Sequence, residues 1–259
     1  MPTKFKELLA TDELIPLFAL GRLVDPIILE MVGIAGGYRG FWLDIEHAQI
    51  STTEITAATI AGRANGLDNF VRMAPTGYAP VTQCLEAGAG GVMAAMIHNV
   101  DQAREFASWA KFPPVGIRGL NSGGRDANYT HKPLSQFVED ANRDTFVAIQ
   151  VETLGALEQA DEIAGLDGVD ILFVGPSDLS MAVGVVGQFH HEKLWDAIKA
   201  VAAACHKHGK TWGCVAPDPQ FAQQAIDLGC RMPTFGNEVH AIRRGIAAIQ
   251  EGFQDFLGS

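Results

Sequence analysis

Two stretches of the chain decide the fold: FVAIQVET at residues 146–153 and FVGPSDLS at residues 173–180. Each begins as an uninterrupted apolar run and ends abruptly at an acid, Glu152 in the first stretch and Asp178 in the second. Continuous apolar runs without polar alternation are typical of parallel strands that are covered on both faces. The two stretches therefore predict successive parallel strands that deliver two carboxylates to the same end of a sheet.

The same unit of a strand followed by a helix recurs along the chain. The segments between the apolar runs have helical period, and several start at Asp, Ser or Asn and end at Gly. The predicted strands are residues 15–20, 40–46, 69–73, 91–96, 146–152, 169–175, 211–216 and 231–236. This pattern predicts an α/β protein with a (β/α)8 TIM barrel that forms a single domain over residues 1–259. A doubly wound open sheet is the alternative.

Composition narrows the classes of partner. The net charge of −11 and the pI of about 5.1 argue against nucleic acid, since phosphate binding needs a basic face. We expect no signal peptide and no membrane helix, because no run approaches the roughly 18 apolar residues that a span needs. The four cysteines, Cys84, Cys205, Cys214 and Cys230, lack zinc-site spacing and predict reduced thiols in a cytoplasmic protein.

Functional groups of a barrel lie at the C-terminal ends of its strands. At those positions the sequence places four acids, a histidine, an arginine and a glutamine, namely Asp44, Glu46, Glu152, Asp178, His47, Arg72 and Gln150. Glu152 and Asp178 have no histidine or thiolate at ligand spacing, so they suit a hard divalent ion such as Mg²⁺ or Mn²⁺. Such an ion acts as a Lewis acid that polarises a carbonyl.

The neighbouring residues predict a binding site for an anionic small molecule. Gly175 allows a ligand to approach the backbone, and the amides of Ser177 and Asp178 at a helix start suit a carboxylate, whereas Pro176 offers no amide hydrogen. Arg72 would stabilise developing negative charge, and His47 would transfer protons. Each side chain also has a structural interpretation: the acids as helix N-caps, His47 as a structural histidine, Arg72 as the counterion of Asp44 or Glu46, and Gln150 as a partner of backbone groups.

Three further observations bear on function. The segment 111–132 is rich in Gly, Pro and Asn, and its arginines Arg118 and Arg125 favour a role near the site, with a plain surface loop as the alternative. The glycines at 88–91 indicate a helix end and a tight turn at the opposite face of the barrel rather than a nucleotide loop. No lysine falls at a C-terminal strand end, which disfavours imine chemistry.

These residues resemble the HpcH/HpaI family of metal-dependent class II pyruvate aldolases, within the phosphoenolpyruvate/pyruvate barrel superfamily. The similar motifs follow the family's order over nearly the whole chain: WLDIEHA at 42–48, VR at 71–72, LEAG at 85–88, PPVGIRG at 113–119, QVET at 150–153 and GPSDLS at 175–180. The segments AAMIHN at 94–99, LNSGGRDANY at 120–129 and CRMPTFGNEV at 230–239 depart from the family, as does Glu86 in place of aspartate.

The resemblance implies roles and an assembly. It implies that Glu152 and Asp178 bind Mg²⁺, Mn²⁺ or Co²⁺, that Gln150 and the turn of Gly175, Pro176, Ser177 and Asp178 position pyruvate, and that Arg72 stabilises its enolate. It makes His47 the acid/base, helped by a carboxylate at the position of Glu86. It also implies a homohexamer whose subunits exchange C-terminal helices; the apolar stripe with Phe253, Phe256 and Leu257 suits such a helix.

The expected function is therefore a lyase that reversibly cleaves a 4-hydroxy-2-oxo acid into pyruvate and an aldehyde. An oxaloacetate decarboxylase, or another enolate-forming lyase or synthase of the superfamily, remains the alternative, as does a non-catalytic barrel that binds an oxo acid.

Overall fold

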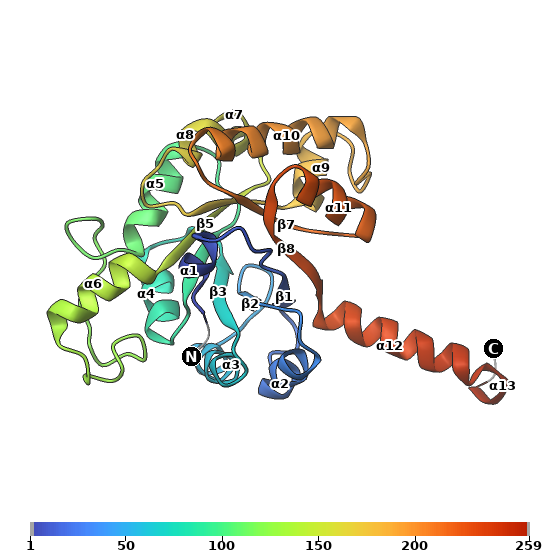
Figure 1. The fold of residues 1–259 in the computed structure, drawn as a ribbon, viewed down its shortest axis with the longest axis horizontal. Coiled ribbons are helices and arrows are strands. Elements are labelled where there is room, and N and C mark those ends of the chain that lie inside the picture. Colours follow the sequence, from blue (N-terminus) through green and yellow to red (C-terminus); the bar gives the residue numbers. More distant parts are fainter. Residues whose placement is uncertain (1–2, 258–259) are drawn as a thin grey trace.

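The chain forms a closed barrel of eight parallel strands in sequential order, β1 to β8, and helices surround it (Figure 1). The computed structural model describes residues 3–257. The strands are β1 Leu17–Leu20, β2 Gly40–Asp44, β3 Asp68–Met73, β4 Gly91–Ala94, β5 Phe146–Val151, β6 Ile171–Val174, β7 Trp212–Val215 and β8 Cys230–Asn237. Every strand predicted from the sequence is confirmed, and the closed order rules out the open sheet.

The helices follow the strands as the sequence predicts. They are α1 Phe5–Leu9, α2 Pro26–Ala35, α3 Thr52–Ala64, α4 Tyr78–Glu86, α5 Val100–Trp109, α6 Leu134–Asp144, α7 Leu154–Glu158, α8 Ala160–Ala164, α9 Pro176–Ala182, α10 Glu192–Lys207, α11 Pro219–Asp227, α12 Glu238–Gly252 and α13 Gln254–Leu257. Side-chain caps begin many of them. Ser51 and Glu54 form a capping box at α3, for example, and Asp218 accepts from the Phe221 amide at α11.

The barrel interior is closed at its N-terminal end. Phe5, on α1, lies within the same buried cluster as the inward-facing residues of the strands, with its ring 5.9 Å from that of Phe70 and 5.5 Å from that of Phe146. The Phe5 amide donates to Asp68 Oδ2 at 2.7 Å. A Cβ on Gly40 would collide with the Phe5 ring and would lie 2.5 Å from the Asp68 carbonyl oxygen, so glycine is needed there. This plug leaves the C-terminal ends of the strands as the open mouth.

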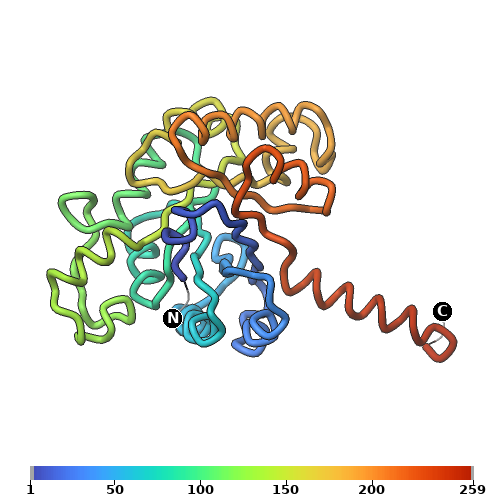
Figure 2. Tube along the Cα trace, viewed as in Figure 1, coloured from blue at the N-terminus to red at the C-terminus, as the bar shows by residue number. Residues whose placement is uncertain are grey.

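The last helices do not complete the ring around the barrel. Figure 2 follows the trace from α1 (blue), at the barrel end, to α12 and α13 (red), which project away from the barrel. The projecting helices expose apolar side chains: Val239, Ile242, Ile246, Ile249, Phe253, Phe256 and Leu257. Glu238, the first residue of α12, is buried. The Oε1 atom of Glu238 accepts hydrogen bonds from the amides of Gly21 and Arg22 at 2.8 and 2.5 Å.

Across residues 3–257, none of the helices is long and apolar enough to span a bilayer.

Candidate active site

Glu152 is the buried carboxylate at the centre of the open mouth. It directly follows β5 and is only 2% exposed. Its Oε1 accepts from the backbone amide of Met96 at 2.7 Å, and its Oε2 accepts from the side-chain amide of Gln150. The helix that follows, α7, is capped by Thr153 instead. The interpretation of Glu152 as an N-cap is therefore wrong.

The surroundings of Glu152 disfavour its charged form. Burial raises the pKa of this carboxyl to about 7, and the negative charges of Glu46 and Asp178 add to the rise, while the Met96 amide and Arg72 oppose it. A buried acid that is crowded by two further acids and retains few donors is stabilised when a cation enters among them. Perturbed carboxyl groups of this kind cluster at functional sites.

Gly175 and Asp178 bring the second acid to the same place. Gly175 follows β6 and precedes α9, which begins at Pro176, so Asp178 lies in the first turn of α9. A Cβ on Gly175 would lie 2.5 Å from Glu152 Oε2 and would also collide with the Gln150 amide. Gly175 therefore lets the end of β6 approach the carboxylate of Glu152. Gly175 is the N-cap residue of α9 and no side chain caps this helix, so Asp178 is not an N-cap.

The donor that holds Glu152 belongs to an unusual backbone. Met96, two residues beyond β4, has a φ of 51°, which side chains other than those of Gly, Asn and Asp rarely adopt. Its side chain is 41% exposed while its amide points at Glu152. The segment AAMIHN, where the sequence departs from the family, thus supports the site through its main chain.

Arg72 is fixed at the mouth by two partners, Asp44 and Trp42. Its Nη2 donates to Asp44 Oδ2 at 2.6 Å and its Nε to Asp44 Oδ1 at 3.1 Å, so the guanidinium and carboxylate form a two-pronged pair. The guanidinium also lies over the Trp42 ring, 5.0 Å from its centroid. The interpretation of Arg72 as a counterion of Asp44 is confirmed. The same pairing holds the guanidinium group near Glu152. The positive charge of Arg72 lowers the pKa of Glu152 and so opposes part of the rise that burial causes.

His47 and Glu46 follow β2 on the same side of the mouth. His47 Nε2 lies 3.6 Å from Glu46 Oε2, and the histidine side chain is 58% exposed whereas that of Glu46 is 11% exposed. Glu46 Oε2 also lies 3.5 Å from Arg72 Nε. This oxygen is buried without a hydrogen bond.

Glu86 lies elsewhere. It is the last residue of α4, where its Oε2 accepts from Asn121 Nδ2 at 2.9 Å and its carbonyl oxygen accepts from the Arg125 amide. Within the described chain Glu86 has no contact with His47, so its help to His47 stays a prediction.

The residues present fit a hard divalent ion. Across residues 3–257, no three His, Cys, Asp or Glu side chains converge as metal ligands. Asp178 lies close enough to raise the pKa of Glu152. A pair of carboxylates that leaves the other positions to substrate oxygens and water is common at Mg²⁺ and Mn²⁺ sites. The side-chain oxygen of Gln150 is buried and has no hydrogen-bond partner, so a donor or a cation would also stabilise it.

The loop at 111–132 does not reach this mouth within one chain. Arg118 is buried, pairs with Asp126 and stacks on Phe112 with its guanidinium 4.6 Å from the ring centroid. It lines a cavity of about 330 Å³ together with Asp68 and Thr145, which precede or begin strands at the N-terminal end of the barrel. The expected role of Arg118 near the site is therefore wrong for a single chain, because aromatic packing holds it at the opposite end. Arg125 lies against Gly88, which precedes β4 at that same end.

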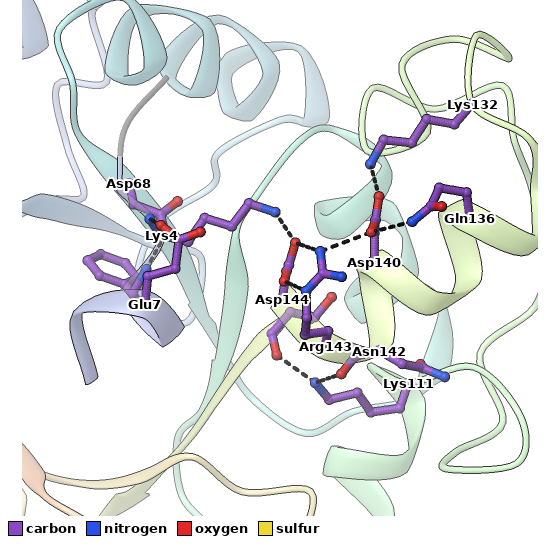
Figure 3. Close-up of polar contacts among 12 residues, drawn as sticks. Lys4, Glu7, Asp68, Lys111, Lys132, Gln136, Asp140, Asn142, Arg143 and Asp144 are labelled. Carbon is purple, nitrogen blue, oxygen red and sulfur yellow. Dashed lines mark hydrogen bonds and ion pairs between the residues drawn. The ribbon is translucent and has the colours of Figure 1, made fainter. Parts of the chain in front are cut away.

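The rim of that cavity is an ion-paired network, shown in Figure 3. Lys4 pairs with Asp144 at 2.5 Å, and Arg143 bridges Asp144 and Asp140 at 2.6 and 2.9 Å. Lys132 also pairs with Asp140, at 2.9 Å. These ion pairs and the Phe5 plug on α1 hold the N-terminal end of the barrel closed.

Comparison with known proteins agrees with this geometry. Residues 24–244 match the family model described as HpcH/HpaI aldolase/citrate lyase. The chain belongs to this family. A 4-hydroxy-4-methyl-2-oxoglutarate aldolase of Hapsidospora irregularis is 36% identical over 199 residues, which cover 75% of this chain and 73% of the relative. A 5-keto-4-deoxy-D-glucarate aldolase of Klebsiella pneumoniae is 27% identical over 98% of this chain and 97% of its own.

A solved structure from the same family shows the same fold. The HpcH/HpaI aldolase of Desulfitobacterium hafniense matches with a TM-score of 0.87 and 28% identity, over 96% of this chain and 97% of that chain. The predicted family, barrel and enzyme class, a carbon–carbon lyase, are thus confirmed.

One contributor to the site, the backbone amide of Met96, escaped the sequence analysis. It has no sequence signal, because any residue except proline carries a backbone N–H.

Proposed function

We propose that the protein is a class II aldolase that reversibly cleaves a 4-hydroxy-2-oxo acid into pyruvate and an aldehyde. The observation that carries this proposal is the approach of Gly175 to Glu152: the end of β6, followed by Asp178, lies against a buried carboxylate whose pKa is raised to about 7. The printed activities of the two aldolase relatives support the same reaction class.

Glu152 and Asp178 would hold a divalent ion, which is Mg²⁺, Mn²⁺ or Co²⁺ in this proposal. When bound, the ion supplies a Lewis acid that polarises the 2-keto group and offsets negative charge. The preference for a hard ion follows from the donor set of two carboxylates. The Met96 amide and the Gln150 amide hold the Glu152 carboxylate in place for this task.

The oxo acid would bind along the start of α9. The amides of Ser177 and Asp178 belong to the first turn of this helix, where N–H groups have no partner within the helix, so they can donate to the substrate carboxylate. Pro176 fixes the turn without an amide of its own, and Gly175 leaves room for the substrate at the backbone. Gln150, on β5, would orient the 2-keto group of the substrate.

Proton transfer and charge stabilisation fall to His47 and Arg72. His47 accepts the proton of the 4-hydroxyl group, directly or through one water. The electron pair of the C3–C4 bond passes to the pyruvate fragment, and the oxygen left on C4 becomes the aldehyde carbonyl. The resulting enolate is stabilised by Arg72, which Asp44 and Trp42 already hold in place. Protonation of C3 then gives the methyl group of pyruvate.

The test needs no knowledge of the aldehyde. Metal-free protein is mixed with pyruvate in D₂O, and loss of the methyl proton signal is followed by NMR with and without Mg²⁺. Metal-dependent exchange is expected, because it reports the enolate directly; its absence with every divalent ion would contradict the proposal. Oxaloacetate decarboxylation passes through the same enolate, so comparing turnover of oxaloacetate and of 4-hydroxy-2-oxo acids separates these two reactions.

We also propose a homo-oligomer, a hexamer by family resemblance, in which neighbouring subunits exchange α12. The exposed stripe of α12 supports this, and α2 offers a matching apolar face with Ile27, Met31 and Ile34 exposed at 63, 64 and 79%. A single functional domain over 1–259 and a cytoplasmic location complete the proposal; the four buried, unpaired cysteines suit a reducing compartment.

A further inference from the structure

Glu46 is an acid whose side chain is almost completely buried at the mouth of the barrel. Its side chain is 11% exposed, and its Oε2 is buried without a hydrogen bond. An unpaired buried carboxylate oxygen is costly, and it demands a donor. Two N–H groups lie near it: Arg72 Nε at 3.5 Å and His47 Nε2 at 3.6 Å.

Only one of these two donors is free. Arg72 already gives its Nε hydrogen to Asp44 Oδ1 at 3.1 Å, and its Nη2 is engaged by the other oxygen of Asp44 at 2.6 Å. His47 Nε2 makes no such competing contact among the described residues. Its imidazole is 58% exposed, so a movement of about half an ångström brings Nε2 to hydrogen-bond distance at little packing cost.

We propose that Glu46 is the positioning residue of His47: it accepts the Nε2 hydrogen, selects that tautomer and leaves Nδ1 as the nitrogen that takes the substrate proton. This inference rests on the proposed function, since it assigns a partner to the base of that reaction. A carboxylate on one imidazole nitrogen fixes the orientation of the ring and stabilises the cation that forms when the other nitrogen takes a proton.

The proposal differs from the assignment that the family resemblance implies. Glu86, the expected helper, lies at the C-terminal end of α4 and is bound by Asn121, whereas Glu46 is adjacent to His47 in both sequence and space. The dyad is therefore complete within one chain.

The electrostatics of the mouth have four other contributors. Asp44 is the last residue of β2, Arg72 lies on β3, Glu152 follows β5 and Asp178 lies on α9. Asp44 and Arg72 neutralise each other as a pair, and a divalent ion would offset Glu152 and Asp178. Glu46 is then the acid whose side chain approaches the His47 ring, with Oε2 3.6 Å from Nε2.

The first experiment measures the tautomer. In ¹⁵N-labelled wild-type protein at pH 8 to 9, the ring nitrogen shifts of His47, identified by their absence from His47→Asn, should report a hydrogen on Nε2. A hydrogen on Nδ1 overturns the proposal.

The second experiment removes the charge and keeps the shape. In Glu46→Gln, the acid limb of the kcat profile should move to lower pH by about 0.5 to 1 unit, and kcat should fall about tenfold or more. Glu105→Gln, an exposed acid on α5, removes the same charge and should match the wild type. An acid limb within about 0.2 unit of the wild type overturns the proposal.

Two precautions keep the outcomes distinct. If Glu46→Gln fails to fold, Glu46→Asp keeps the charge but withdraws the carboxylate by about one bond length; it should still lose kcat, and unchanged kcat overturns the proposal. Wild-type protein that shows no metal-dependent exchange of pyruvate contradicts the proposed function. Wild-type exchange combined with an unshifted Glu46→Gln profile contradicts only the role of Glu46.

Discussion

Replacing Gly175 by alanine tests the geometry on which the site depends. The added Cβ would lie 2.5 Å from Glu152 Oε2, so the carboxylate must withdraw by about 0.9 Å to reach the 3.4 Å of ordinary contact. Metal–oxygen distances tolerate only about 0.2 Å. The backbone itself is not strained, because Gly175 has φ −93° and ψ 92°, which alanine also adopts. We expect Mn²⁺ affinity to fall about 10- to 100-fold, or about 1.4 to 2.7 kcal/mol.

Isothermal titration calorimetry with Mn²⁺ measures this loss, and thermal unfolding followed by circular dichroism reports the fold. Gly168→Ala is the matched control, because its Cβ would contact only Ala107 Cβ, at 3.2 Å. The control should bind Mn²⁺ as the wild type does, with at most a small drop in melting temperature. Wild-type affinity in Gly175→Ala would refute the reasoning that Glu152 holds the ion at this position.

Four further predictions follow from the site and the projecting helix. In metal-free protein, Glu152→Gln should raise the free energy of unfolding at pH 8 by about 2 kcal/mol and leave it unchanged near pH 4.5, as urea titrations would show. The sign follows from the pKa of about 7: between about pH 4.5 and 7 the unfolded carboxyl ionises while the folded one resists, so stability falls as pH rises. For the same reason, wild-type Mn²⁺ affinity should fall up to about tenfold per pH unit below 7, and calorimetry showing a flat profile would contradict this. Arg72→Ala should keep Mn²⁺ binding but lose about 10²- to 10³-fold in kcat, and comparable kcat would exclude the enolate role. Ile246→Asp should shift the sedimentation coefficient towards smaller species, whereas an unchanged coefficient would show that α12 does not dock on a neighbour.

Local sequence was sufficient for the barrel. A few neighbouring residues specify each element, so the positions of the elements were predictable. Examples are the strand FVAIQV, the capping box of Ser51 and Glu54 at the start of α3, and the glycines at 88–91 between α4 and β4. The ends of the strands also placed Glu152 and Asp178 on one face, because a parallel barrel fixes the direction of every strand.

Contacts between distant segments were not predictable in the same way. The position of the 111–132 loop depends on the packing of Arg118 against the rings of Phe112 and Phe137. These two phenylalanines lie on different segments of the chain. Whether Glu46 serves Arg72 or His47 depends on the fact that Arg72 already donates to Asp44, and no sequence pattern encodes that pairing.

The left-handed residue Met96 has a consequence for how this scaffold diversifies. The Glu152 carboxylate accepts a hydrogen bond from the main-chain N–H of Met96, while the Met96 side chain is 41% exposed at the edge of the mouth. Glycine, asparagine and aspartate adopt this left-handed backbone most readily, and each of them keeps the N–H. Substitution of Met96 by one of these three residues therefore changes the surface at the edge of the mouth and keeps the hydrogen bond to Glu152.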